Sequence, residues 1–149
     1  MELVIKKFEE LSVYELYEIL QARSAVFVVE QTCPYQDMDN KDKGAYHVWL
    51  RDEAGIAAYV RVLDTGVSYE DAASIGRVIS LRRHRGYSSI LLKEGIRIAR
   101  EKYGAKAIKI GAQKYARSLY EKAGFEQCGE DYLEDGIVHI PMKLREEWL

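Results

Sequence analysis

The chain has 149 residues, the length of a single domain of common size. Hydrophobic residues make up 48% of it and charged residues 31%, a balance typical of a globular protein in water. The formal net charge of −2 argues against general nucleic-acid binding, which needs a positive excess. Residues 1–7 lack the apolar centre of a secretory signal, and no apolar run is long enough to span a membrane. We expect one domain, residues 1–149, in the cytoplasm.

The N-terminal part is predicted to form a strand, a helix and a loop. Weak alternation of apolar residues favours a strand at residues 3–8. Ser12 and Glu15 have the spacing of a capping box, in which the hydroxyl and the carboxylate each accept a backbone amide, so a helix is expected to follow. The apolar run 25–29 is predicted to be buried, and the polar, turn-rich residues 33–42 are predicted to form a loop.

The middle of the chain has the pattern of three strands. Two of them, residues 45–51 and 56–64, flank the turn signal 52–55 and are expected to form a hairpin. Residues 73–81 are predicted to be the third strand. Gly76 within it indicates a bulge or the close approach of another backbone.

The clearest helical pattern spans residues 87–103, where apolar residues recur at helical spacing and Gly104 stands at the position of a left-handed cap. Pro141 lacks a backbone N–H, so the last strand is expected to bulge or to leave an edge there. The remaining predicted elements are a strand at 105–111, a short helix at 115–123 and strands at 125–129 and 137–144.

This order of elements predicts an α+β fold with three layers. A mixed, mostly antiparallel and twisted sheet of six to seven strands would be flanked by helices on both faces. Charge is distributed unevenly along the domain: residues 9–71 carry a net charge of −8, residues 77–102 carry +6 and residues 126–135 carry −5. Such blocks are usually solvated surfaces, but their order suggests two ligand regions of opposite sign.

The loop at residues 80–89 combines basic residues with the start of the long helix. A helix N-terminus offers unpaired amides and a partial positive charge. Gly86 lets the backbone approach a bulky anion, and Arg83 and Arg85 supply forked donors suited to phosphate. The combination predicts a cradle for a pyrophosphate. The alternative is a basic loop that only solvates the start of the helix.

Two segments of the sequence carry a family resemblance. Residues 83–88, Arg-His-Arg-Gly-Tyr-Ser, resemble the acyl-CoA signature Gln/Arg-x-x-Gly-x-Gly/Ala of the GCN5-related N-acetyltransferases (GNAT). Ser88 replaces the usual Gly or Ala, but serine is small and caps helices well, so binding is expected to survive. Residues 119–125, Leu-Tyr-Glu-Lys-Ala-Gly-Phe, match a second segment of that superfamily. Further segments, among them 26–31 and 130–139, are similar to the ElaA-like branch.

The resemblance implies a GNAT-like sheet and the transfer of an acetyl group from acetyl-CoA to a primary amine. The amine would belong to a small molecule or an exposed protein group and would attack directly in a ternary complex. Tyr120 falls where the superfamily has its general acid, and the amide of Val78 would polarise the thioester carbonyl. The residues expected to hold the donor are Val78, Ile79, Ser80, Arg83, Arg85, Gly86, Tyr87, Ser88, Ser89 and Gln113.

The base that takes the proton of the amine stays open at this point. Glu30 follows an apolar run that would raise its pKa, and the ordinary pKa of a histidine such as His47 is near neutrality. Candidates for a negative pocket around the amine, and further candidates for the base, are Asp37, Asp39, Glu134, Asp135 and His139. Each also has a structural alternative, such as the capping of turns by Asp37 and Asp39.

The two cysteines, Cys33 and Cys128, have neither metal-ligand spacing nor a disulfide pattern, so we expect reduced thiols and no metal. Cys128 is expected in the core. A nucleophilic pair of Cys33 with His47 is an alternative to an inert cysteine before Pro34.

Three other functions remain as alternatives. The departure at Ser88 and the uncertain identity of the base suggest a silent module that senses acetyl-CoA. An acyl-homoserine-lactone synthase shares the fold that the resemblance implies. Nucleic-acid binding would have to rest on Arg82, Arg83 and Arg85 alone, without interleaved aromatic residues. A homodimer is compatible with the resemblance.

Overall fold

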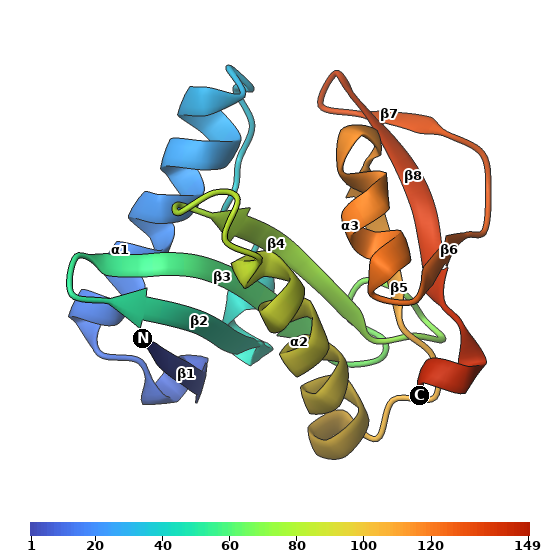
Figure 1. Ribbon diagram of the computed structural model, residues 1–149, viewed down its shortest axis with the longest axis horizontal. Coiled ribbons are helices and arrows are strands. Elements are labelled where there is room, and N and C mark those ends of the chain that lie inside the picture. The colour runs from blue at the N-terminus through green and yellow to red at the C-terminus, as the bar shows by residue number, and fades with distance from the viewer.

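The computed structural model describes all residues, 1–149, and arranges their strands in two antiparallel four-stranded sheets (Figure 1). The first sheet consists, in spatial order, of β1 (Glu2–Lys7), β2 (Tyr46–Asp52), β3 (Gly55–Leu63) and β4 (Ser74–Ser80). In the second, β8 (Ile137–Leu144) pairs with β5 (Lys109–Gln113), β6 (Phe125–Gln127) and β7 (Tyr132–Glu134). The predicted α+β, mostly antiparallel fold is confirmed, with eight strands in two sheets instead of six to seven in one.

The two sheets meet between β4 and β5 and then separate. The one link is a parallel bridge between Ala73 and Ile108, in which Lys109 N donates to Ala73 O at 2.9 Å. Beyond this bridge the backbones of the two sheets diverge (Figure 1). The residue pattern cannot predict such a separation, because a strand alternates in the same way whether its lateral partner is present or absent.

Helices cover both faces of the first sheet, as predicted. They are α1 (Val13–Arg23) on one face, α2 (Tyr87–Tyr103) on the other and α3 (Arg117–Lys122) beside the second sheet (Figure 1). Short helical turns occupy Phe8–Glu10, Lys41–Gly44, Lys114–Ala116 and Glu146–Trp148. The capping box at Ser12 and Glu15 is confirmed, and so is Gly104 as the left-handed cap of α2, with φ of +62°.

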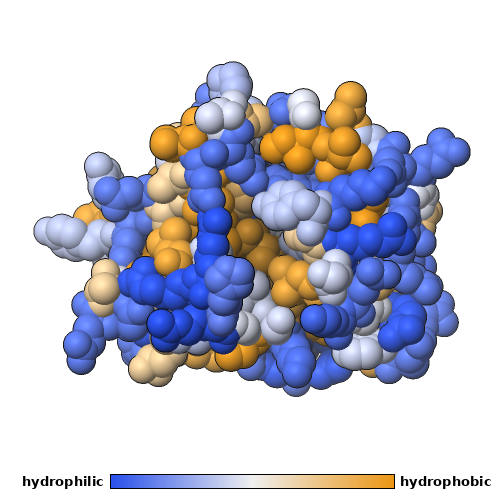
Figure 2. Space-filling view, turned by 45° about the horizontal axis from the view of Figure 1, so that its top comes forward, coloured by the Kyte–Doolittle hydropathy of each residue, from blue (hydrophilic) through white to orange (hydrophobic).

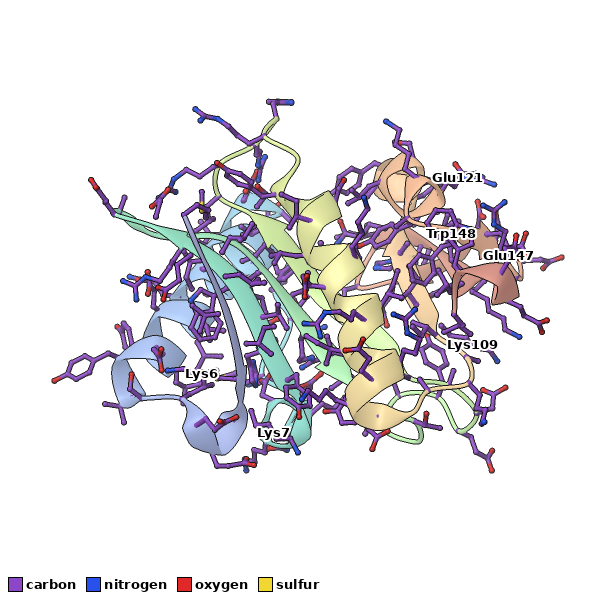
Figure 3. The ribbon with its side chains drawn as sticks, turned by 60° about the horizontal axis from the view of Figure 1, so that its bottom comes forward. Lys6, Lys7, Lys109, Glu121, Glu147 and Trp148 are labelled. Atoms are coloured by element: carbon purple, nitrogen blue, oxygen red, sulfur yellow. The ribbon has the colours of Figure 1, made fainter.

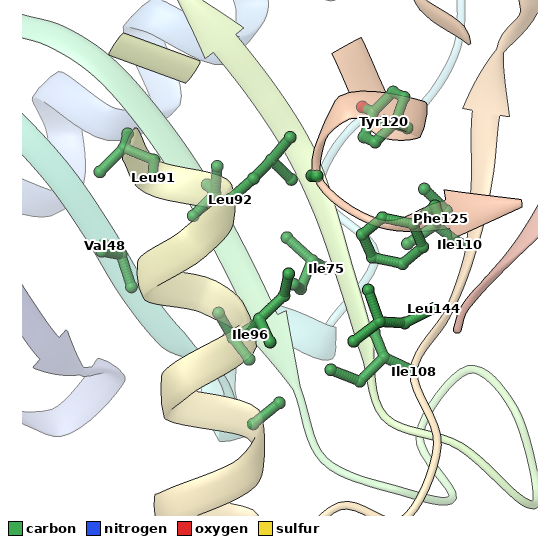
Figure 4. Packing of buried hydrophobic residues seen from close by; sticks show 14 of the residues in the cluster. Val48, Ile75, Leu91, Leu92, Ile96, Ile108, Ile110, Tyr120, Phe125 and Leu144 are labelled. Carbon is green, nitrogen blue, oxygen red and sulfur yellow. The ribbon is translucent and has the colours of Figure 1, made fainter. Parts of the chain in front are cut away.

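The alternation of side chains along the strands creates two cores. Val48 and Val60 face α2 and pack with Leu92 in the larger cluster, which continues into the second sheet (Figure 4). Trp49 and Tyr59 point to the opposite face and pack against α1 in the smaller cluster. Every second residue of β2 and β3 is therefore placed under α1, on the face opposite α2.

Strand β4 contains a bulge one residue beyond Gly76, close to the predicted place. Tyr59 of β3 pairs with Ile79, but Arg61 pairs with Gly76, so two residues of β4 face the single residue between them on β3. One of these two, Arg77, has a positive φ of 53°. A bulge leaves a residue outside the ladder and bends the strand.

The structure corrects two local expectations, for residues 25–29 and for Cys128, and explains the position of Pro141 in the last strand. Residues 25–29 were expected to be buried, but Ser24–Glu30 continue α1 as a π-helix in which only Val26 is buried. Cys128 is exposed, so its placement in the core was wrong. Pro141 lies opposite the gap between β6 and β7, where its missing N–H breaks no ladder.

The C-terminal turn closes the second sheet. The ring of Trp148 lies directly over Gly124, whose φ of +103° and lack of Cβ leave room for it. Figure 3 shows Trp148 beside α3 and the charged side chains Lys109 and Glu147 at the periphery. On the other side of the molecule Lys6 of β1 pairs with Glu15 of α1 at 2.8 Å. No helix combines the length and apolar character needed to cross a bilayer.

Candidate active site

A cleft of about 800 Å³ occupies the opening between the two sheets. Hydrophobic residues lie in the hollow between the two halves of the molecule, and hydrophilic residues surround it (Figure 2). Its walls come from β4, from the segment after α1, from α3 and from the second sheet. The cleft therefore exists because β4 and β5 separate beyond their single bridge.

Most of the residues predicted to hold an acyl donor lie on one side of this cleft. The lining includes Val78, Ile79, Ser80, Arg83, Ser88 and Gln113. The others lie in the adjoining loop and the first turn of α2 and do not line the cavity: Arg85, Gly86, Tyr87 and Ser89. Apart from Gln113, which comes from β5 of the second sheet, the predicted set is thus gathered around β4 and the start of α2.

The N-terminus of α2 is open. Gly86 is the N-cap residue with φ of +72°, a conformation that favours glycine, and no side chain caps the helix. The amides of Tyr87, Ser88 and Ser89 therefore have no partner within the helix. Because α2 is 17 residues long, its dipole adds partial positive charge at these amides. This end of the helix is suited to binding an anion.

The bulge of β4 supplies a second polar feature of the cleft. Arg77 and Val78 are the two residues opposite Val60 of β3, and both line the cavity. A residue that a bulge removes from the ladder has backbone groups free for another partner. The strand is thus suited to present an amide to an oxygen in the cleft, as predicted for Val78.

Arg83 and Glu30 form an ion pair at the cleft. Arg83 Nη2 donates to Glu30 Oε2 at 2.6 Å, which links the loop before α2 to the end of the π-helix. Glu30 follows the apolar run but is not buried with it, since its side chain is 46% exposed and its charge is paired. The structure therefore gives Glu30 a role in holding Arg83.

Tyr120 lies in the wall of the cleft and is only 9% exposed. Its ring packs edge-to-face on Phe125, with centroids 6.2 Å apart (Figure 4). Burial, with a smaller contribution from Tyr115, raises the pKa of Tyr120 well above that of an ordinary phenol. The hydroxyl is therefore protonated at neutral pH and able to donate a proton.

His47 lies outside the cleft, so its assignment as a candidate base was wrong. It sits on the α1 side of β2 and is fully buried. Its Nδ1 is 2.7 Å from the Tyr59 hydroxyl and its Nε2 is 2.9 Å from Asp42 O. Burial lowers the pKa of His47. A pair with Cys33 is also excluded, because the Cys33 thiol contacts Asp135 O instead.

The predicted negative pocket at Asp37 and Asp39 was wrong as well, because both carboxylates are neutralised by arginines. Asp37 is buried outside the cleft lining, and its partner Arg23, which is fully buried, also binds Asp42 at 2.6 Å. Asp39 lines the cleft but binds Arg61 through both oxygens, at 2.8 and 3.0 Å. Burial would raise the pKa of Asp39, yet Arg61 outweighs this and the pKa falls to about 2.

The other candidates for the amine side do meet in the cleft. Glu134, Asp135 and His139 all belong to its lining. They are joined by Tyr69 and Tyr132, which the sequence reasoning missed. Tyr132 stands two residues before Glu134 in β7, so the period of a strand gave a signal for it, whereas Tyr69 lies in a loop and had none.

Gln31 was also missed. Its amide exchanges hydrogen bonds with the Gln113 amide, at 2.9 and 3.2 Å, and so joins the segment after α1 to β5. Gln113 is the register partner of His139 in β8. These contacts place the first and second sheets around the same cavity.

Comparison with known proteins identifies the family. A model of the acetyltransferase (GNAT) domain matches residues 10–146, so the chain belongs to this family. A UPF0039 protein of Schizosaccharomyces pombe is 36% identical over 148 residues, 97% of each chain. Protein ElaA of Escherichia coli is 40% identical over 139 residues, 89% of each chain.

Solved structures agree with this assignment. The crystal structure of an acyl-CoA N-acyltransferase from Pseudomonas aeruginosa has a TM-score of 0.89 and 35% identity, and covers 97% of this chain and 100% of its own. The AHL synthase LasI, at 14% identity and a TM-score of 0.71, shares the fold alone. The predicted resemblance to GNAT proteins and to ElaA is therefore confirmed.

Proposed function

We propose that the protein transfers an acetyl group from acetyl-CoA to a primary amine in a ternary complex. One observation carries the proposal: a single cleft is bordered by the open N-terminus of α2, the bulge of β4 and the buried hydroxyl of Tyr120. These three features match the three demands of the reaction, which are an anion site, a donor for the developing oxyanion and an acid for the leaving thiolate.

The roles of the residues follow from their positions. The amides of Tyr87, Ser88 and Ser89, with Arg83 and Arg85, hold the pyrophosphate of the donor. The acyl arm lies along Val78–Ser80, where a bulge amide binds the thioester oxygen. Tyr120 gives its proton to the departing sulfur, and burial keeps that proton in place until then. The amine attacks from the side of the second sheet.

The test begins with binding. Calorimetry with acetyl-CoA is expected to detect a complex, and thiol release is expected with at least one member of a panel of alkylamines, amino-acid amides and lysine peptides. No heat with acetyl-CoA would refute the proposal. Binding without thiol release for any amine would favour the acetyl-CoA sensor, and thermal stabilisation by S-adenosylmethionine would favour the lactone synthase.

A matched pair of glycine variants checks the anion site. Gly86 and Gly104 both have positive φ, both have open space for a Cβ, and they stand at opposite ends of α2. Replacement of either by alanine strains the backbone by about 1 kcal/mol. Only Gly86→Ala is expected to weaken acetyl-CoA binding, and an equal effect of Gly104→Ala would contradict the assignment.

A further inference from the structure

His139 has a defined tautomer in the wall of the cleft. Its Nδ1 is 2.8 Å from Ile137 O, and a carbonyl oxygen can only accept a hydrogen bond. Nδ1 therefore carries the proton. In the neutral ring the lone pair is then on Nε2, the nitrogen that lies 3.4 Å from Glu134 Oε2.

When the ring is neutral, Nε2 of His139 and the Glu134 carboxylate are two acceptors with no donor between them. The other charged groups of the cleft do not supply one. Its arginines are paired elsewhere: Arg61 with Asp39 and Asp42, Arg77 with Asp37 and Asp39, and Arg83 with Glu30. The one lysine of the lining, Lys41, donates to Ser68. The two acceptors thus lack the cationic partner that their chemistry favours.

Two tyrosines lie beside the buried member of this pair, His139. The Tyr132 ring stacks on the His139 ring with centroids 5.6 Å apart, and the hydroxyls of Tyr132 and Tyr69 both lie over Gly111. Burial, followed by the charge of Glu134, raises the pKa of Tyr132 to about 12 and raises that of Tyr69. Both are neutral phenols at pH 7 and provide aromatic faces for an alkylammonium group.

We propose that Glu134 and Nε2 of His139 bind the ammonium group of the acceptor and that His139 takes its proton. The inference rests on the proposed function and identifies the acceptor as a primary alkylamine. Such an amine enters as a cation, whose N–H groups satisfy both acceptors. His139 is a catalytic residue in this assignment, and Glu134 holds the substrate.

The proton and electron balance is complete. The ammonium gives one proton to His139 Nε2, which passes it to water. The freed lone pair forms the C–N bond with the thioester carbon, and the C–S bond breaks with its electron pair on sulfur. The Tyr120 proton neutralises that sulfur, and the second proton lost by the nitrogen restores the Tyr120 hydroxyl.

The first test measures binding by NMR, with n-butylammonium as the probe and butan-1-ol as its neutral control. The titratable groups facing His139 are Glu134 and Tyr132 of β7 and Tyr69 of the loop between β3 and β4, while β5 adds the uncharged Gln113. Butylammonium is expected to change the chemical shift of the His139 ring protons in a saturable way, because the bound ammonium group donates to Nε2. Butan-1-ol should leave it unchanged, and the exposed His84 should respond to neither. Equal responses to both probes would overturn the ammonium site.

The second test is kinetic and uses the best amine of the panel. His139→Gln is expected to lower kcat/KM at pH 7 by about 10²-fold or more and to remove the acidic limb of the pH profile. Its acetyl-CoA affinity should be unchanged. Glu134→Gln is expected to raise KM for the amine about tenfold, whereas Glu126→Gln, on the exposed face of β6, should not.

The outcomes separate the two proposals. An acidic limb that persists in His139→Gln, with native turnover present, refutes the role of His139 alone. Absence of turnover with every amine in the native protein refutes the proposed function, while the NMR titration still decides the ammonium site. Partial recovery of His139→Ala by added imidazole would support proton transfer, since a structural role gives no reason for such rescue.

Discussion

Arg77 Nε lies 2.8 Å from Asp37 Oδ1, and this ion pair fastens the bulge of β4 to the loop that follows α1. Arg77 Nη2 adds a hydrogen bond of 2.9 Å to Asp37 O. The same residue has a positive φ, which costs an ordinary side chain free energy. The ion pair therefore stabilises a backbone conformation that the residue would not adopt alone.

The first prediction concerns this anchor. Arg77→Gly should tolerate the positive φ but lacks the ion pair, so the bulge is expected to lose its fixed position. We expect kcat to fall by about 10²-fold, since a shift of about 1 Å in a catalytic group has this effect. Steady-state kinetics measure the loss of kcat, and a melting curve measures any loss of stability separately. Full activity of the glycine variant would mean that the bulge needs no anchor.

Tyr120→Phe tests the general acid. Loss of the hydroxyl is expected to reduce kcat by about 10²-fold or more while acetyl-CoA binding is retained. Because burial holds the pKa of Tyr120 above its usual value near 10, the native enzyme should show no alkaline limb from this group up to pH about 10. Tyr103→Phe removes a hydroxyl bonded to Gly44 O, far from the cleft, and should keep full activity.

The pair of Arg83 and Glu30 predicts a gain of affinity. Both side chains are about half exposed, so their attraction is worth about 0.2 to 1 kcal/mol. Glu30→Gln frees Arg83 for the pyrophosphate and is expected to tighten acetyl-CoA binding by up to about fivefold in calorimetry. Glu101→Gln breaks a comparable pair with Arg97 on α2 and serves as the control. Weaker binding by Glu30→Gln would show that the carboxylate itself helps to hold the donor.

Acid is expected to destabilise the fold through the buried ion pairs. The pKa of Asp39 is about 2 in the folded protein against 3.8 for a free side chain, because Arg61 outweighs the cost of burial. A lowered pKa stabilises the fold above pH about 4, and this stabilisation of about 2 kcal/mol is lost as the pH falls to about 2.

Urea unfolding at several pH values measures this loss. Asp39→Asn should be less stable than the native protein at pH 6 and should show a weaker dependence on pH between about 4 and 2. Glu53→Gln changes an exposed turn carboxylate and should behave like the native protein. An unchanged pH dependence in Asp39→Asn would contradict the assignment.

The structural features that were predicted correctly are formed by residues close together in the sequence. A capping box needs only Ser12 and Glu15, and a left-handed cap needs only Gly104 at the end of a periodic segment. The loop before α2 and the segment around Tyr120 are also local motifs, which is why the family resemblance was predictable.

The acceptor side depends on contacts between distant residues, which no local pattern encodes. His47 is no longer a candidate base because it is buried outside the cleft, and Asp37 is no longer a candidate for the amine pocket because it pairs with arginine. Glu30, expected as a candidate base, instead forms an exposed ion pair with Arg83. Tyr69 reaches the cleft from a loop without a motif.

The sequence by itself determined the fold class and the family, and it located the segments that we propose to hold the donor, because these follow from short-range patterns. Only the tertiary structure decided which carboxylates lack an arginine partner, because the two residues of an ion pair can be far apart in the sequence. Of the acidic residues proposed for the amine, the structure leaves Glu134 beside His139 without an arginine, in the cleft that the separation of β4 and β5 opens.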